Sequence, residues 1–224
     1  MKQTGCGPVV RAPLPAGSAM SFLENPDLAW CEINETLVFL DISKDRYFRL
    51  SNDQNREALE TIDRSEFGRW HQPVALTGLS KWTPPTRSCA AIGFGSFQMA
   101  EVARALWVQR RVEWRIAKQP FGSVIADFCR VREARAGNLP VSSNIASCTI
   151  RGFEHARLLR TAAERCLARS IALALCLTSR GVRAHVVLGV RLAPFGAHCW
   201  AQADDQVLND SVEEVLRYKP ILFI

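Results

Sequence analysis

A cysteine, a histidine and an aspartate in the last third of the chain have the residue types and the order of a nucleophilic centre. Cys166 opens an apolar run, rich in Ala and Leu, that predicts a helix to about Ser179, ended by Arg180-Gly181. A thiol in the first turn of a helix meets the positive end of the helix dipole, which favours the reactive thiolate. Cys166 is therefore the candidate nucleophile.

The segments after this helix supply the partners that a reactive thiol needs. Ala184 to Leu192 has the branched residues and the length of a strand, and Ala197 to Ala203 predicts a second strand with His198 near its start. Asp210 ends the short segment that follows. An imidazole takes the thiol proton and a carboxylate orients the imidazole, so the order predicts a catalytic triad of Cys166, His198 and Asp210.

Other residues compete for the roles of base and acid. The remaining histidines are His71, His155 and His185. The first lies in a turn-like segment far upstream, the second in the helix before Cys166, and the third opens a strand with no carboxylate segment directly after it. Asp204 and Asp205 lie where a hairpin turn is expected, and turns favour Asp for backbone reasons. We interpret all five as structural or surface residues.

The composition is that of an ordinary globular protein. The chain has 224 residues, of which 48% are hydrophobic and 22% charged, and we expect two domains. The N-terminus lacks the apolar segment of a signal peptide, and no run approaches membrane-spanning length. We therefore expect no membrane partner, a cytoplasmic location and free thiols for the eight cysteines. No C-x-x-C pair and no zinc-like His spacing is present, so we expect no metal and no bound cofactor.

The N-terminal part predicts a small sheet followed by helices. Residues 1–20, rich in Gly, Pro and Ala, predict a flexible arm. A helix capped by Ser51 or Asn52 follows the strands, and further short helices are expected near Ser65 and near Thr77 or Ser80. Pro84-Pro85 ends the unit. The predicted strands, the first two joined by a turn at Asn34-Glu35, are Leu28 to Ile33, Thr36 to Ile42 and Arg46 to Leu50.

Helices connect the two parts. Phe97 to Lys118 and Phe121 to Ala136 have apolar residues at helical spacing, and Val141 to Thr149 is expected to be a polar loop. Trp107 and Trp114 lie seven residues apart in the first of these helices. We predict that they pack on the core; exposure of the pair would instead suggest a docking face.

The C-terminal motifs resemble a known family. The run C-L-x-R-S-x-A-L, then R-G-V, L-G-V, A-H-x-W and V-L-N-D, is similar to the transglutaminase-like cysteine proteases of lasso peptide biosynthesis, often called B proteins. The resemblance covers roughly Glu164 to the C-terminus and puts Cys166, His198 and Asp210 at the catalytic positions. It implies a papain-like, transglutaminase-type α+β domain over residues 89–224. Cys199 departs from the pattern, because the family more often has a small residue there.

The same resemblance implies a reaction and partners. The protease would hydrolyse one peptide bond in a ribosomally made precursor, in the bacterial cytoplasm, and so free the core peptide from its leader. The released amine would then be joined to an acidic side chain by a separate asparagine-synthetase-like lasso cyclase that consumes ATP. The precursor leader and this cyclase are therefore the expected partners.

The N-terminal run LVFLDISKDRYFRLSNDQNREALETI resembles the PqqD-like leader-recognition module, a small winged-helix domain. The resemblance covers residues 21–88 and implies that a leader peptide adds to the edge of the third strand. The leader-binding residues would then be Arg46, Tyr47, Phe48, Arg49 and Leu50. The alternative is a small sheet in which Tyr47 and Phe48 only fill a core, and alternation turns one of them inward in either case.

Two other functions share these features. A transglutaminase-like acyltransferase would use the same triad, with an amine in place of water in the second step. A winged-helix DNA-binding regulator would suit the net charge of +6. However, residues 1–87 carry 10 basic and 11 acidic side chains against 18 and 11 in the remainder, so the winged-helix part is slightly acidic. A DNA-reading domain should be the basic part, so we expect no nucleic-acid partner.

Overall fold

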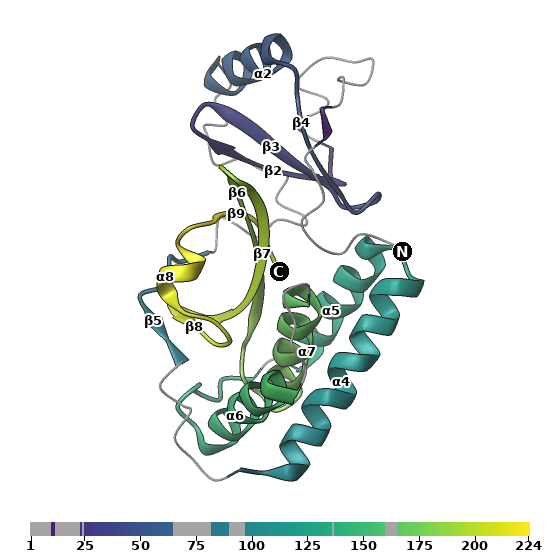
Figure 1. Ribbon diagram of the computed structural model, residues 1–224, viewed down its shortest axis with the longest axis vertical. Helices are drawn as coiled ribbons and strands as arrows, with labels where there is room; N and C mark the ends of the chain where they lie inside the picture. The colour runs from purple at the N-terminus through teal and green to yellow at the C-terminus, as the bar shows by residue number, and fades with distance from the viewer. Residues whose placement is uncertain are drawn as a thin grey trace.

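The N-terminal part of the computed structural model is a sheet covered by one helix, as Figure 1 shows at the top of the view. The structure describes residues 10–11, 23, 25–64, 82–89, 97–135, 137–159 and 165–224. The sheet has the strand order β1-β4-β3-β2. Its strands and the helix that follows them are β1 (Val10–Arg11), β2 (Leu28–Ile33), β3 (Thr36–Asp41), β4 (Arg46–Arg49) and α2 (Asn52–Arg64).

Local sequence accounts for these elements. Asn34 and Glu35 adopt the left-handed conformation with φ of 49° and 60°, which lets the chain reverse in two residues and pair Ile33 with Thr36. The Ser51 hydroxyl accepts a hydrogen bond from the backbone N–H of Gln54, so Ser51 caps the start of α2. The three predicted strands, their turn and the helix start are confirmed.

The two faces of this sheet pack against different partners. Trp30, Phe39 and Phe48 face α2, and the rings of Phe39 and Phe48 stack at 5.2 Å. On the opposite face, Ala29 and Leu40 belong to a hydrophobic core that continues into the C-terminal part. Because successive residues of a strand point to opposite faces, the sheet is buried on both sides and joins the two parts of the molecule.

The outer edge of β4 carries another strand. β1 pairs with β4 in parallel, with Val10 opposite Phe48 and Arg11 opposite Arg49. The expectation of a free edge over Arg46 to Leu50 therefore needs correction, because β1 covers part of it. A peptide that added to β4 would have to displace β1.

The C-terminal part packs helices against a second sheet with the order β5-β8-β7-β6-β9 (Figure 1). Helix α7 contacts β7 on one face of this sheet, and α4, α5 and α6 surround α7. The helices are α4 (Met99–Lys118), α5 (Phe121–Arg135), α6 (Asn144–Leu159), α7 (Cys166–Thr178) and α8 (Val212–Val215). The strands are β5 (Arg87–Ser88), β6 (His185–Leu192), β7 (Phe195–Ala203), β8 (Gln206–Val207) and β9 (Lys219–Phe223).

Helix α4 contradicts the expectation for its two tryptophans. Its buried stripe includes Val102, Val112 and Ile116, whereas Trp107 and Trp114 lie on the opposite face and are 62% and 60% exposed. The Arg111 guanidinium lies 5.6 Å from the centre of the Trp107 ring, where a cation–π contact favours it. The prediction of core tryptophans is wrong, and a docking face stays a hypothesis.

Helix α6 also starts earlier than expected. The Ser143 hydroxyl accepts a hydrogen bond from the Ala146 N–H, so the helix begins at Asn144 and the predicted loop is wrong from there to Thr149. This capping hydrogen bond favours a helix in a segment whose polar composition predicted a loop.

Several predictions fall outside the described residues. They are the arm, apart from β1, and the short helices near Ser65 and near Thr77 or Ser80. The full winged helix and the domain limits at residues 20 and 88 stay predictions, although β5 pairs with β8 of the C-terminal sheet. Within the ranges that the structure describes, no helix has the combined length and hydropathy needed to cross a bilayer.

Candidate active site

Cys166 is the first residue of α7, as the sequence predicted. The residue before it, Arg165, makes no side-chain capping bond to the N–H groups of the first turn. Burial alone would raise the pKa of the Cys166 thiol. A hydrogen bond and the positive charge of His198, with backbone hydrogen bonds at Cys199 and Leu167, outweigh it and lower the pKa below its usual value. The site therefore favours a thiolate.

His198 lies on β7 between this thiol and Asp210. Its Nε2 is 2.7 Å from Asp210 Oδ2, which leaves the other ring nitrogen for the Cys166 thiol. Burial opposes a charge on the ring, but hydrogen bonds with Asp210 and with Cys166 raise the pKa of His198 to about 9. The expected resting pair is a thiolate and an imidazolium.

The Asp210 carboxylate is fixed from both sides. Its Oδ1 accepts a hydrogen bond of 2.9 Å from the Ser211 N–H, while Oδ2 faces His198. Burial would raise the pKa of Asp210, yet the bonds from His198 and Ser211 hold it below the usual value. Ser211 in turn caps α8 by accepting from the Glu214 N–H. Asp210 therefore stays charged beside the ring.

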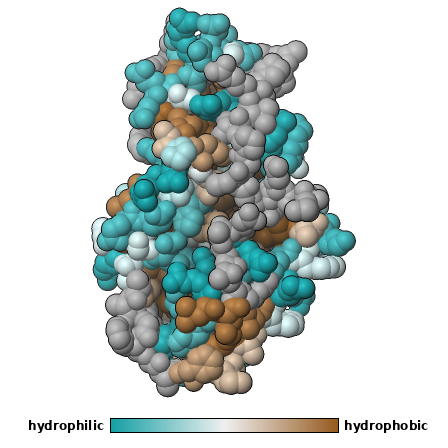
Figure 2. All heavy atoms as spheres, viewed as in Figure 1, coloured by the Kyte–Doolittle hydropathy of each residue, from teal (hydrophilic) through white to brown (hydrophobic). Residues whose placement is uncertain are grey.

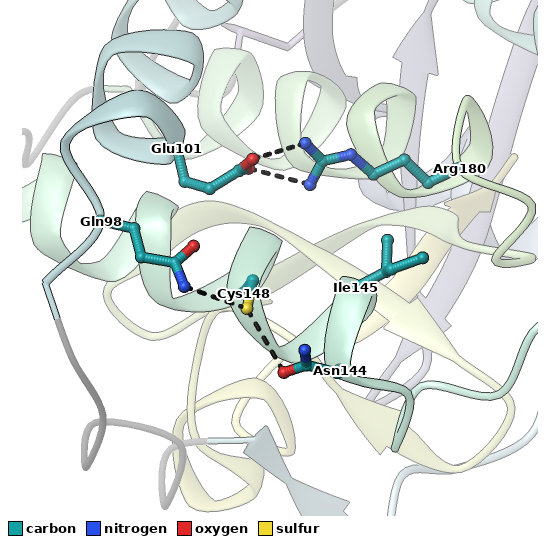
Figure 3. A pocket seen from close by; sticks show the side chains of 6 residues that line it. All are labelled: Gln98, Glu101, Asn144, Ile145, Cys148 and Arg180. Atoms are coloured by element: carbon teal, nitrogen blue, oxygen red, sulfur yellow. Dashed lines mark hydrogen bonds and ion pairs between the residues drawn. The ribbon is translucent and has the colours of Figure 1, made fainter.

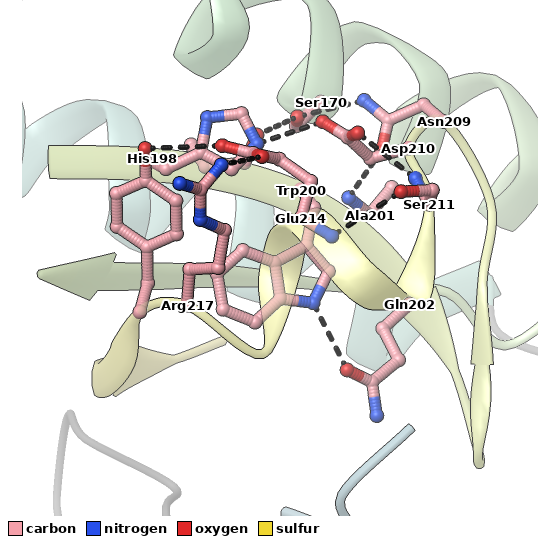
Figure 4. A network of polar contacts seen from close by, with 12 residues as sticks. Ser170, His198, Trp200, Ala201, Gln202, Asn209, Asp210, Ser211, Glu214 and Arg217 are labelled. Atoms are coloured by element: carbon pink, nitrogen blue, oxygen red, sulfur yellow. Dashed lines mark hydrogen bonds and ion pairs between the residues drawn. The ribbon is translucent and has the colours of Figure 1, made fainter. Parts of the chain in front are cut away.

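A buried polar network holds these three segments together (Figure 4). The Ser170 hydroxyl, one turn after Cys166 on α7, donates to the Cys199 carbonyl at 2.9 Å. Asn209 donates to the Ser170 hydroxyl at 2.9 Å and accepts from the Ala201 N–H at 2.8 Å. Because Cys199 follows His198 and Asn209 precedes Asp210, the network fixes the spacing between the segments that carry Cys166, His198 and Asp210.

Sequence reasoning assigned no role to Ser170 or Asn209. Both stand inside the quoted motifs, as the serine of C-L-x-R-S and the asparagine of V-L-N-D. A polar residue on the buried face of an apolar helix is the signal that was available, since buried polar groups need partners.

The ring of His198 is held by aromatic neighbours on the outer face of the sheet. The Tyr218 ring centre lies 5.1 Å and the Trp200 ring centre 6.2 Å from that of His198. Gly189 lies opposite His198 on β6, and a side chain there would meet Tyr218 and Trp200. The absence of a side chain at Gly189 therefore lets both rings approach.

Cys199 has the opposite character to Cys166. Its side chain is buried on the α7 face of β7, and burial raises its pKa well above the usual value. Burial likewise raises the pKa of Cys31 to about 12 and that of Cys176 to about 11. Among the described cysteines with a shifted pKa, only Cys166 is lowered, which supports it as the nucleophile.

The competing histidines make other contacts. The His155 ring lies 5.2 Å from the Phe97 ring, and the His185 ring stacks on Phe223 at 4.4 Å. His71 lies outside the described residues.

The competing aspartates serve the β7–β8 turn. Asp204 has a φ of 49° in that turn. Asp205 pairs with Arg87 and accepts from the Thr86 hydroxyl, which ties β5 to the sheet. Neither aspartate contacts His198.

One pocket lies at the far end of α7 from Cys166 (Figure 3). It encloses about 550 Å³ and is lined by residues that include Glu101, Cys148 and Arg180. Arg180 forms a two-pronged ion pair with Glu101 and so ties the end of α7 to the start of α4.

In the described part of the chain, no group of three His, Cys, Asp or Glu has a metal-binding arrangement.

The proposed leader residues divide between faces. Tyr47 points to the C-terminal part, whereas Phe48 and Leu50 are buried in the core under α2. Arg46 is exposed and Arg49 is partly buried.

Comparisons with known proteins identify the family. A model of the transglutaminase-like superfamily matches residues 101–223, more than half of the chain. Over 46 residues the chain is 48% identical to the microcin J25-processing protein McjB of Escherichia coli, and this stretch covers 20% of the chain and 22% of McjB. No solved structure matches. These matches confirm the predicted resemblance, and since the family match includes α7, β7 and Asp210, the chain belongs to the transglutaminase-like superfamily.

Proposed function

We propose that this protein is a cysteine peptidase that removes the leader from the precursor of a lasso peptide. The observation that carries the proposal is the contact of 2.7 Å between His198 and Asp210, together with the Cys166 thiol at the start of α7, whose pKa His198 lowers. Similarity to a protein that processes microcin J25 supports the substrate class.

The proposed reaction has two steps. The Cys166 thiolate attacks the scissile carbonyl carbon, and the N–H groups at the start of α7 are suited to bind the negative oxygen. The His198 imidazolium gives its proton to the leaving amine as the C–N bond breaks, which leaves a thioester. Neutral His198 then takes a proton from water, and the resulting hydroxide releases the leader carboxylate and restores the thiolate. Asp210 keeps the ring oriented throughout.

This chemistry needs no bound metal or cofactor, and its product defines the next enzyme. Hydrolysis frees the N-terminal amine of the core peptide. A separate lasso cyclase would consume ATP to join that amine to an acidic side chain, so we propose the precursor and this cyclase as partners. The bacterial cytoplasm, which keeps thiols reduced, is the proposed location.

We propose the β4 edge as the site of leader recognition. A leader strand added there would use the backbone N–H and C=O groups of residues Arg46 to Leu50 for affinity. The short pairing with β1 is two residues long, so its displacement would cost few hydrogen bonds.

Mass spectrometry of the precursor from the same gene cluster tests the peptidase. We expect wild type to release the leader, Cys166→Ala to release none, and Cys199→Ala to retain activity because its thiol is buried and protonated. In water enriched in heavy oxygen, hydrolysis puts the label into the leader carboxylate. A leader joined to an added amine would instead show an acyltransferase.

Cleavage by Cys166→Ala at the wild-type rate would contradict the triad. Binding of a fluorescent leader peptide to the Cys166→Ala variant, followed by anisotropy, tests recognition separately from chemistry.

A further inference from the structure

Strand β4 presents two aromatic side chains to two different environments. Phe48 lies opposite Phe39 and packs in the core under α2. Tyr47 lies opposite Leu40 and points toward the C-terminal part, because adjacent residues of a strand alternate between faces. Strand β4, the proposed leader-binding strand, thus also directs the Tyr47 side chain toward the C-terminal part.

Tyr47 packs on the α7 side of β7. Its ring meets the Phe195 ring edge-on at 5.8 Å, and Phe195 lies on the same face of β7 as Cys199, because residues four apart in a strand point to the same side. Tyr47 packs against the same hydrophobic cluster as Cys166 and Cys199. Burial raises the pKa of its hydroxyl, and the charges of Cys199 and Cys166 add to the shift, so the phenol lies within electrostatic reach of the thiolate.

The Tyr47 hydroxyl has no hydrogen-bond partner in the part of the chain that the structure describes, although a partly buried tyrosine hydroxyl usually has one. Because burial raises the pKa of this hydroxyl above its usual value, the phenol is protonated at neutral pH and can donate a hydrogen bond to a peptide carbonyl.

We propose that Tyr47 is a substrate-positioning residue that lies beside the substrate site at Cys166 and donates a hydrogen bond to the peptide bound there. The inference rests on the proposed peptidase function and deepens it. Strand β4 and the Tyr47 side chain would then lie between the leader, bound at the β4 edge, and the scissile bond at Cys166. The N-terminal sheet would fix which peptide bond enters the site.

The Tyr47→Phe variant of the full chain tests this proposal, because it keeps the ring against Phe195 and removes only the hydroxyl. We expect kcat/KM for the precursor to fall about fivefold to tenfold, the loss of one neutral hydrogen bond. The alkylation rate of Cys166 by iodoacetamide, the affinity for isolated leader peptide and the melting temperature should not change. Thr36→Val removes a hydroxyl from the same sheet at its hairpin and should leave kcat/KM unchanged.

Each outcome is decisive. Wild-type kcat/KM in Tyr47→Phe overturns the proposal and leaves Tyr47 a packing residue. A fall in leader affinity that accounts for the whole loss also overturns it, because Tyr47 would then act on the leader. The proposal is also overturned if Tyr47→Phe slows alkylation of Cys166 by the same factor as hydrolysis. The hydroxyl would then act on the Cys166 thiol and not on the substrate. Failure of wild type to cleave the precursor refutes the peptidase function itself, a result separable from the other three.

Discussion

Replacing Asn209 by alanine should loosen the arrangement of the proposed triad without changing Cys166, His198 or Asp210. The Asn209 amide donates to the Ser170 hydroxyl at 2.9 Å and accepts from the Ala201 N–H at 2.8 Å, and all three residues are buried. Truncation removes two hydrogen bonds of about 1 kcal/mol each and leaves the Ala201 N–H without this acceptor, at about a further 1 kcal/mol. The free energy of unfolding should fall by about 3 kcal/mol, which lowers the melting temperature by roughly 6 to 12 °C in a chain of this size.

The same change should alter the chemistry of Cys166. With Asn209 gone, the Asp210 segment is free to shift away from β7, and the hydrogen bond that raises the pKa of His198 weakens. Less thiolate then forms at neutral pH. We expect at least about a tenfold loss of kcat/KM and slower alkylation by iodoacetamide at pH 7.

Asn55→Ala is the matched control. Asn55 also makes two backbone hydrogen bonds, accepting from the Leu37 N–H at 2.8 Å and donating to the Glu35 carbonyl at 2.7 Å, but it lies in the N-terminal part. Asn55→Ala should lower the free energy of unfolding. It should not change the rate at which iodoacetamide alkylates Cys166 at temperatures where the protein is folded. Equal alkylation rates in the two variants, or an unchanged melting temperature in Asn209→Ala, would refute the positioning role of the network.

Three further predictions concern the pH profile, a glycine and the N-terminus. Because the pKa of His198 is raised to about 9, the imidazolium is present below that pH and lost above it, so kcat/KM should decline above about pH 9; in Asp210→Asn, the decline should begin at lower pH. Gly189→Ala would put a Cβ 2.8 Å from that of Tyr218 and should cost about 1 to 3 kcal/mol in urea unfolding, with loss of activity; unchanged values would show that the rings are free to move. Deleting residues 1–11 removes β1, so leader affinity measured by anisotropy should rise several-fold, whereas a fall would mean that β1 supports the edge.

Local patterns predicted the elements that carry the site. The alternation of β2 to β4 and the apolar run of α7 depend on nearest neighbours in the chain, and the structure confirms them. The α+β class and the transglutaminase-like domain follow from the same patterns and motifs. Cys166 stands at the start of α7, His198 lies on β7 and Asp210 follows β8, so the order of the three candidate residues follows the order of these elements.

Tertiary contacts decided what local patterns left open or misjudged. The tryptophans of α4 have the spacing of a buried stripe, but a helix buries only the face that neighbouring helices cover, and that face belongs to Val102 and Val112. The start of α6 depended on one serine cap. No spacing in the sequence indicates that β1 pairs with β4.

The sequence by itself determined the elements that carry the candidate nucleophile, histidine and carboxylate, since those elements are coded by local patterns. Only the tertiary structure decided that Ser170 and Asn209 lock these elements together and that Tyr47 crosses from one part of the molecule to the other. The physical reason is range: helix dipoles and strand alternation act within a few residues, whereas buried hydrogen bonds and packed rings join segments far apart in the chain.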